Sequence, residues 1–186
     1  MKRAFDLVLA SLALLFLALP MLAVALAVRL SSPGPALYWS ERVGRHNRLF
    51  RMPKFRSMRT GAPQLATHEF DNPARWLTPI GSFLRKTSLD ELPQLWSILK
   101  GDMSFVGPRP ALFNQHDLIE LRTQAGVHLL LPGLTGWAQV NGRDELPIAA
   151  KVRLDAEYLQ RRSFRFDIAI LFRTFAKVLQ REGVAH

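Results

Sequence analysis

The sequence predicts an α/β protein that is mostly helical, has a small sheet content and is attached to a membrane. Residues 7–28 (LVLASLALLFLALPMLAVALAV) carry no charged side chain, and at about 1.5 Å per helical residue this run could cross a bilayer core of roughly 30 Å. Downstream, segments with helical periodicity alternate with a short strand-like stretch and with loops rich in glycine and proline. We therefore expect a membrane helix at 1–30 and one soluble domain at 31–186.

The composition limits the chemistry of this chain. Its 186 residues carry a formal net charge of +10, so the expected partners are anionic: lipid headgroups, nucleic acid or a phosphorylated substrate. The absence of cysteine excludes disulfides, thiolate zinc sites and cysteine nucleophiles. The apolar run is longer than the roughly 7–15 residues of a signal-peptide core, and no small-residue cleavage site follows it. We therefore expect a retained membrane segment.

A proline interrupts the apolar run, and basic side chains stand at both of its ends: Lys2, Arg3 and Arg29. Because proline removes a backbone hydrogen bond and disfavours helical geometry at the preceding residue, a kink or break is expected near Leu19–Pro20. Basic flanks favour the cytoplasmic side of a membrane. A helix broken at Pro20 would enter and leave through one face and keep both ends there, whereas an ordinary kinked span is the alternative.

The domain begins with strand and loop segments. Residues 31–40 contain a turn and then a short predicted strand. Residues 42–59 carry seven basic and no acidic side chains, and we interpret this run as a basic surface that is either solvated or in contact with anionic lipid or phosphate. Residues 60–75 are polar and rich in turn-forming residues, which predicts a mobile loop. Glycine- and proline-rich loops are expected at 101–110 and, around a short strand, at 131–143.

Helices are predicted at 78–84, 87–100, 112–125, 147–162 and 167–181. The second of these has the clearest pattern, because four apolar residues recur at helical spacing: Leu92, Leu95, Trp96 and Leu99. Gly101 follows them as a predicted C-cap. The last helix, with Asp167 as its predicted N-cap, either packs on the core or lies on lipid as an amphipathic helix.

Two adjacent carboxylates, Asp90 and Glu91, stand at the predicted start of the 87–100 helix, with Arg85 just upstream. A helix N-terminus favours anions. Two carboxylates there could hold a magnesium ion that bridges phosphate oxygens, and a carboxylate can also act as a nucleophile. Arg85 could offset the charge of a transferred phosphoryl group. The same residues also fit a capping box that joins Ser88 to Glu91, or Asp90 as an N-cap.

Several stretches, in collinear order, resemble the bacterial sugar transferase family, the monotopic phosphoglycosyl transferases: KRAFDLVLA (2–10), SSPGPALYWSERVGR (31–45), KFRSMRT (54–60), RKTSLDELPQLWSILKGDMSFVGPRP (85–110) and PGLTGWAQVNGR (132–143). The resemblance implies that a UDP-sugar gives its phosphosugar to an enzyme aspartate and releases UMP. Polyprenol phosphate, undecaprenyl phosphate in most bacteria, then attacks. It also implies magnesium, a re-entrant membrane helix, interfacial helices on anionic lipids, and a cytoplasm-facing domain on the bacterial inner membrane.

The resemblance assigns roles position by position. Asp90 matches the nucleophile of the family's Asp-Glu dyad, Glu91 matches its partner, both are implied as metal ligands, and Arg85 matches the phosphate-contacting arginine. The implied substrate-binding residues are Lys54, Arg56, Arg109, Gln139, Asn141 and Arg143. One departure is Leu19, which stands where members often have serine. The chain also lacks the multi-span region of larger members, so it resembles the minimal catalytic form.

The competing interpretation is a non-catalytic membrane adaptor derived from this family. The intact set of Arg85, Asp90 and Glu91 favours the enzyme. No nucleic-acid-binding motif is recognised in the chain, and we therefore expect no nucleic-acid partner. A homodimer is one assembly that the chain could form.

Overall fold

The structure, a computed structural model, describes residues 1–65, 72–142 and 146–180. Its helices are α1 (Lys2–Ser31), α2 (Gly81–Lys86), α3 (Gln94–Lys100), α4 (His116–Gln124), α5 (Trp137–Val140), α6 (Ile148–Arg161) and α7 (Phe164–Gln180). Its strands are β1 (Leu37–Val43), β2 (Leu49–Phe55), β3 (Ser104–Val106) and β4 (Gly133–Thr135). Short 3-10 turns are η1 (Arg45–Asn47), η3 (Pro73–Trp76), η4 (Leu89–Glu91) and η5 (Val127–Leu129). The described chain is therefore mostly helical with small sheets, as the sequence predicts.

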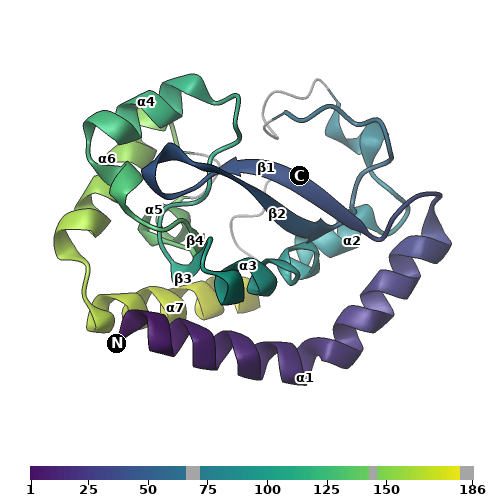
Figure 1. Cartoon of the computed structure of the whole chain (residues 1–186). Helices are drawn as coiled ribbons and strands as arrows, with labels where there is room; N and C mark the ends of the chain where they lie inside the picture. Colours follow the sequence, from purple (N-terminus) through teal and green to yellow (C-terminus); the bar gives the residue numbers. More distant parts are fainter. Residues whose placement is uncertain (66–71, 143–145, 181–186) are drawn as a thin grey trace.

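The N-terminal helix α1 is continuous and contains Pro20. Figure 1 shows that α1 bends near its middle, which is expected where a proline interrupts the helical hydrogen bonds. The distortion predicted at Leu19–Pro20 is therefore a kink within one helix and not a break. By length and composition α1 could cross a membrane, and 6% of its most apolar window is buried.

Both ends of α1 rest against the domain. Near its start, Lys2 Nζ donates to the carbonyl of Val106 at 3.0 Å, and the rings of Phe5 and Phe164 meet edge to face with centroids 5.3 Å apart. Near its end, Val28 lies in a buried cluster with two residues of the domain, Phe55 and Leu84. Figure 1 shows α1 running along one side of the domain, with α7 beside its first half.

Two small sheets carry parts of the domain. Strands β1 and β2 form an antiparallel hairpin, and β3 and β4 pair in parallel. Figure 1 shows the hairpin on the side of α3 that faces away from α1. Strand β2 lies inside the 42–59 run, and strand side chains alternate between the two faces. The Lys54 side chain is 14% exposed and Arg56 is 5% exposed, so the interpretation of the whole run as one basic surface is wrong.

The predicted helix at 87–100 is shorter than expected. Ser88 has a φ of +56°, in the left-handed region, so a helix cannot continue through it. Pro93 lacks a backbone N–H and occupies the N-cap of α3, which begins at Gln94. Asp90 and Glu91 therefore lie in the 3-10 turn η4 before the helix. The predicted C-cap is confirmed, because Gly101 has a φ of +97° and ends α3.

The other predicted helices are present in the structure, and some of their ends differ from the prediction by a few residues. The helix predicted at 78–84 lies at Gly81–Lys86. Helix α7 begins at Phe164, so Asp167 is not its N-cap. Asp167 lies instead in the first turn of α7, where it is buried and accepts hydrogen bonds from Lys2 and Tyr158 at 2.6 Å each. Of the predicted 60–75 loop, residues 66–71 lie outside the described residues.

One buried cluster joins most of these elements. It brings together residues of α1, β2, α3, β3, α5, α6 and α7: Ala10, Met52, Leu95, Ile98, Met103, Phe105, Val106, Val140, Tyr158 and Ile170. The first half of α1 therefore packs against the core through Ala10 and partly buried neighbours such as Leu14 and Leu17. Strand β3 lies inside this cluster and leads directly into the 107–112 loop.

Candidate active site

The two adjacent carboxylates lie in the turn η4, between α2 and α3. Asp90 is 7% exposed. Glu91 Oε1 accepts from Lys54 Nζ at 2.9 Å and from Arg109 Nη2 at 3.1 Å. Ser88 makes no side-chain cap hydrogen bond to this turn. The capping-box alternative is therefore wrong, and the Glu91 carboxylate binds two cations instead.

Positively charged side chains from separate segments surround this dyad. Lys54 comes from β2, Arg85 from α2 and Arg109 from the loop that follows β3. The positive charges of all three act on Asp90. The structure thus gathers the adjacent carboxylates and the nearby Arg85 with Lys54 and Arg109, which lie 37 and 18 residues from Glu91 in the chain. Such a cluster suits a polyphosphate, because the cations offset phosphate charge beside a carboxylate that could attack phosphorus.

Burial is the largest influence on the pKa of Asp90 and on the pKa of Lys54. Burial raises the pKa of Asp90, and the neighbouring Glu91 acts in the same direction, whereas Lys54, Arg85 and Arg109 oppose the shift. Burial lowers the pKa of Lys54, and the charge of Glu91 opposes that shift. The site therefore holds groups whose charged forms depend on one another, an arrangement that is enriched at functional sites.

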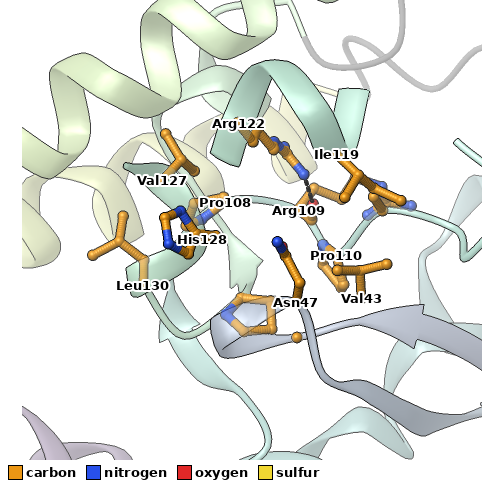
Figure 2. Close-up of a pocket in the computed structure, with 13 residues that line it drawn as sticks. Val43, Asn47, Pro108, Arg109, Pro110, Ile119, Arg122, Val127, His128 and Leu130 are labelled. Carbon is orange, nitrogen blue, oxygen red and sulfur yellow. Dashed lines mark hydrogen bonds between the residues drawn. The ribbon is translucent and has the colours of Figure 1, made fainter. Parts of the chain in front are cut away.

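Arg109 also lines a small cavity on the far side of its loop (Figure 2). The cavity measures about 30 Å³ and is bordered by residues of η1, α4 and η5, among them Asn47, Arg122 and His128. This volume suits one or two water molecules, so the cavity is too small to hold a sugar nucleotide. The Arg109 side chain, which is 30% exposed and lies 3.1 Å from Glu91 Oε1, is the better candidate for contact with substrate.

The glycines of two predicted loops explain how the Arg109 loop is placed. A Cβ atom on Gly133 would lie 2.1 Å from the backbone nitrogen of Gly107, closer than real Cβ contacts allow. The backbones of the two segments therefore meet directly, and Gly133 N–H donates to the carbonyl of Pro108 at 2.9 Å. This contact fixes the start of the loop that carries Arg109.

Arg56, predicted as a substrate-binding residue, lies against the segment that joins α1 to β1. Its guanidinium donates three hydrogen bonds of 2.6 to 2.9 Å to backbone carbonyls between α1 and β1: Ser32, Pro33 and Pro35. Two of these carbonyls belong to prolines, in a turn with few backbone donors of its own. In the structure Arg56 therefore joins the segment after α1 to the end of the hairpin, and its role toward substrate stays a prediction.

The residues predicted near the end of the 131–143 loop lie in or just after α5. Gln139 Nε2 donates to the carbonyl of Leu134 at 3.0 Å, and Asn141 Nδ2 donates to the carbonyl of Trp137 at 2.7 Å. In the part of the chain that the structure describes, neither of these hydrogen bonds reaches the dyad. Arg143 lies outside the described residues.

A comparison with known families identifies the family of this chain. The model of the family described as bacterial sugar transferase matches residues 1–181. This chain belongs to the bacterial sugar transferase family. The resemblance drawn from the sequence motifs is therefore confirmed.

Named relatives of this sugar transferase come from several bacteria. It is 42% identical over 185 residues to the UDP-glucose:undecaprenyl-phosphate glucose-1-phosphate transferase of Escherichia coli (strain K12), covering 95% of this chain and 40% of that protein. It is 39% identical over 199 residues to the undecaprenyl-phosphate galactose phosphotransferase of Salmonella typhimurium, covering 98% of this chain and 41% of that protein. The uncharacterized sugar transferase EpsL of Bacillus subtilis is 40% identical, with 99% of this chain and 90% of that protein covered. The chain thus spans about two fifths of the length of the first two relatives.

The donor set of the dyad fits a magnesium ion. Among the described residues no group of three or more His, Cys, Asp or Glu side chains could hold a metal. Magnesium, however, is commonly held by one or two carboxylates, with substrate phosphates and water completing its coordination. Asp90 and Glu91 are two such hard oxygen donors. The residues of this sugar transferase therefore suit a metal that arrives with a phosphorylated substrate.

Sequence reasoning missed the side chains that hold the Arg109 loop. Arg42 Nη1 donates to the carbonyl of Pro110 at 3.2 Å, and Arg122 Nη1 donates to the carbonyl of Arg109 at 2.8 Å. Arg42 lies in the basic 42–59 run, but no local pattern around either arginine indicates that its partner is the Arg109 loop. The proline content of GDMSFVGPRP was the available clue, because a loop without N–H groups at Pro108 and Pro110 must be held through its carbonyls.

Proposed function

We propose that this sugar transferase moves a phosphosugar from a UDP-sugar to undecaprenyl phosphate, a polyprenol phosphate, through a covalent intermediate on Asp90. The observation that carries the proposal is the buried Asp90–Glu91 dyad with Lys54, Arg85 and Arg109 around it. The names of two relatives describe transfer of a sugar phosphate to undecaprenyl phosphate. UMP is then the leaving product, and the product stays in the membrane as a diphosphate-linked sugar that starts the assembly of a membrane glycoconjugate.

In the first half-reaction, a carboxylate oxygen of Asp90 attacks the phosphorus that bears the sugar. The bond from that phosphorus to the oxygen shared with UMP breaks, and UMP leaves with this oxygen and its electron pair. Arg85 and Arg109 offset the negative charge that gathers on the phosphoryl oxygens. Burial disfavours the ionised form of Asp90 and so makes it a better nucleophile, while the cations keep enough of it ionised to react.

In the second half-reaction, a phosphate oxygen of the polyprenol phosphate attacks the same phosphorus. The bond to Asp90 breaks, and the carboxylate is restored for another cycle. Because one carboxylate serves both steps, the kinetics should be ping-pong. Magnesium, held by Asp90 and Glu91, would supply positive charge to the diphosphate of the donor.

We also propose that the chain is monotopic, with its domain on the cytoplasmic face of the bacterial inner membrane. The support is that both ends of α1 contact one domain, while its outer side exposes large apolar residues such as Leu15 and Phe16. Helix α7, beside α1, exposes Phe172 and Phe175 and carries Arg173 between them in sequence. An amphipathic helix of this kind suits an interface with anionic lipid.

The decisive experiment is a panel of UDP-sugars tested for UMP release, with and without undecaprenyl phosphate. One sugar should give a single equivalent of UMP without acceptor and continuous release with it. Asp90→Asn, in folded membrane-bound protein, should lower release by at least about 1000-fold. Near-normal release by this variant, or a phosphosugar adduct trapped on another residue, would exclude Asp90 as the nucleophile.

A further inference from the structure

The middle of the loop at 107–112 is held through its backbone carbonyls, while the N–H groups at its two ends, Gly107 and Leu112, donate to Thr135 and Gln115. Pro108 and Pro110 have no N–H to donate, so this segment cannot pair as a regular strand. Its carbonyls instead accept from different elements: Pro108 from Gly133 N–H at 2.9 Å, Arg109 from Arg122 at 2.8 Å and Pro110 from Arg42 at 3.2 Å. The direction in which the Arg109 side chain leaves this loop therefore depends on these donors.

Arg122 is a fixed donor because Asp155 holds it. Its side chain is 11% exposed and that of Asp155 is 1% exposed. Arg122 Nε and Nη2 both donate to Asp155 Oδ2, at 3.0 and 2.6 Å. The remaining terminal nitrogen, Nη1, donates to the carbonyl of Arg109, as the dashed line in Figure 2 shows. One planar guanidinium thus ties α6 to the Arg109 backbone.

We infer that Arg122, held by Asp155, is a positioning residue for this sugar transferase, and that it acts by fixing the backbone of Arg109 so that the Arg109 guanidinium reaches Glu91. The backbone of Arg109 is bound by Arg122 on one side, and its side chain lies 3.1 Å from Glu91 Oε1 on the other. The inference rests on the proposed function, because it assigns Arg109 a part in holding the dyad and the donor phosphates.

Lysine cannot replace Arg122 in this arrangement. A lysine ammonium is a compact charge without the planar fork, so it could keep the ion pair with Asp155 or reach the Arg109 carbonyl, but not hold both in this geometry. Arg122→Lys should therefore fold and lose about 10- to 100-fold in kcat for UMP release, the penalty expected when a reacting group is displaced by about 1 Å.

A double-mutant cycle separates positioning from general support of the fold. If Arg122 acts through Arg109, then Arg122→Lys should change kcat less than about 2-fold in a background that already carries Arg109→Ala. Full additivity of the two losses would overturn the inference. Arg153→Gln is the matched control, since Arg153 is an exposed cation on α6 near Asp155, and it should leave kcat unchanged.

A second variant keeps the test decisive if Arg122→Lys fails to fold. The pair Arg122→Met with Asp155→Leu replaces a buried ion pair by apolar side chains, a change that folds often tolerate. It should lose the same 10- to 100-fold in kcat, and unchanged kcat in folded protein would overturn the inference. Asp90→Asn is measured in the same assay. If this variant retains UMP release, the proposed function fails. If it is inactive and the kcat losses of Arg122→Lys and Arg109→Ala are additive, only the role of Arg122 is refuted.

Discussion

Replacing Lys54 by methionine should separate the charge of the candidate site from its packing. Lys54 Nζ lies 2.9 Å from Glu91 Oε1, and its side chain is 14% exposed. Methionine keeps most of the buried stem and removes the charge. Glu91 retains Arg109 at 3.1 Å, so its carboxylate keeps a cationic partner after the substitution. The variant should therefore fold.

The expected loss of stability follows from these contacts. One hydrogen bond between charged groups disappears, which costs about 1.5–3 kcal/mol. Part of this cost is offset, because burial disfavours the charged form of Lys54 and lowers its pKa. We expect the free energy of unfolding to fall by about 1–2 kcal/mol, and Tm by roughly 2–8 °C for a protein of this size.

The pH dependence should change in a defined direction. Burial raises the pKa of Asp90, and among the charges that oppose this shift Lys54 is the strongest. Asp90 must be ionised to attack, so activity rises with pH through that pKa. Without Lys54 the pKa of Asp90 should rise further, and the acidic limb of kcat/KM should move to higher pH.

The stability of the protein should change with pH as well. Asp90 has a raised pKa in the folded state, so its contribution to stability is lost as pH rises through that pKa. The Tm difference between variant and parent should therefore grow from acid toward neutral pH.

The assay is UMP release against pH, with Tm measured at the same pH values. Arg51→Met is the matched control, because Arg51 is an exposed cation on the same strand and should leave the acidic limb in place. An acidic limb that stays put or moves to lower pH in folded Lys54→Met protein would refute the assignment of Lys54 as the main charge that stabilises ionised Asp90.

Further predictions concern the metal, the phosphate contact and the topology. Glu91→Gln should raise the magnesium concentration needed for half-maximal activity by roughly 10-fold or more; full activity of the parent in excess chelator would exclude a metal role. Arg85→Lys keeps the charge and loses the planar fork, so kcat/KM should fall about 10-fold with little change in Tm; a variant that only melts earlier, with normal activity when folded, would indicate a structural residue. Cysteines inserted between Met1 and Lys2 and substituted at Gly61 should both resist an impermeant thiol reagent in intact cells and react after lysis. Labelling of the N-terminal site alone would show that α1 spans the membrane.

The sequence motifs predicted which residues belong to the candidate site better than they predicted the secondary structure around those residues. Asp90 and Glu91 do not begin a helix, because Ser88 takes a positive φ and Pro93 starts α3 after them. Lys54 was identified as a site residue, yet strand β2 was not predicted, since dense positive charge masked the alternation that places Lys54 inward. The periodicity of a strand decides which of its basic residues are buried, and composition does not.

Long-range contacts explain what the sequence could not show. Arg122 and Asp155 are 33 residues apart and belong to different helices, so no spacing rule links them. Asp167 resembled an ordinary N-cap, yet the fold buries it against Lys2, 165 residues away. Such pairs form because a buried charge needs a partner, and the tertiary fold selects that partner. Local patterns therefore predict elements and motifs, but not the arginines that hold the Arg109 loop.

The position of α1 relative to the site would link the proposed membrane attachment to the chemistry. Lys2, at the first turn of α1, donates to the carbonyl of Val106, three residues before Arg109. At the other end, Val28 packs on Phe55 and Leu84. Phe55 and Leu84 are the immediate chain neighbours of Lys54 and Arg85. Two of the three cations are therefore adjacent to residues that α1 contacts, and Arg109 lies three residues after a third, Val106.

The kink at Pro20 makes this arrangement geometrically consistent, because a bent helix can press both of its ends against one side of a domain. A helix that simply projected from the domain would contact it at one end. If α1 lies in lipid, its depth therefore fixes the height of Lys54, Arg85 and Arg109 above the membrane. An acceptor whose phosphate stays at the membrane surface requires a site at constant height, and the contacts at both ends of α1 provide it.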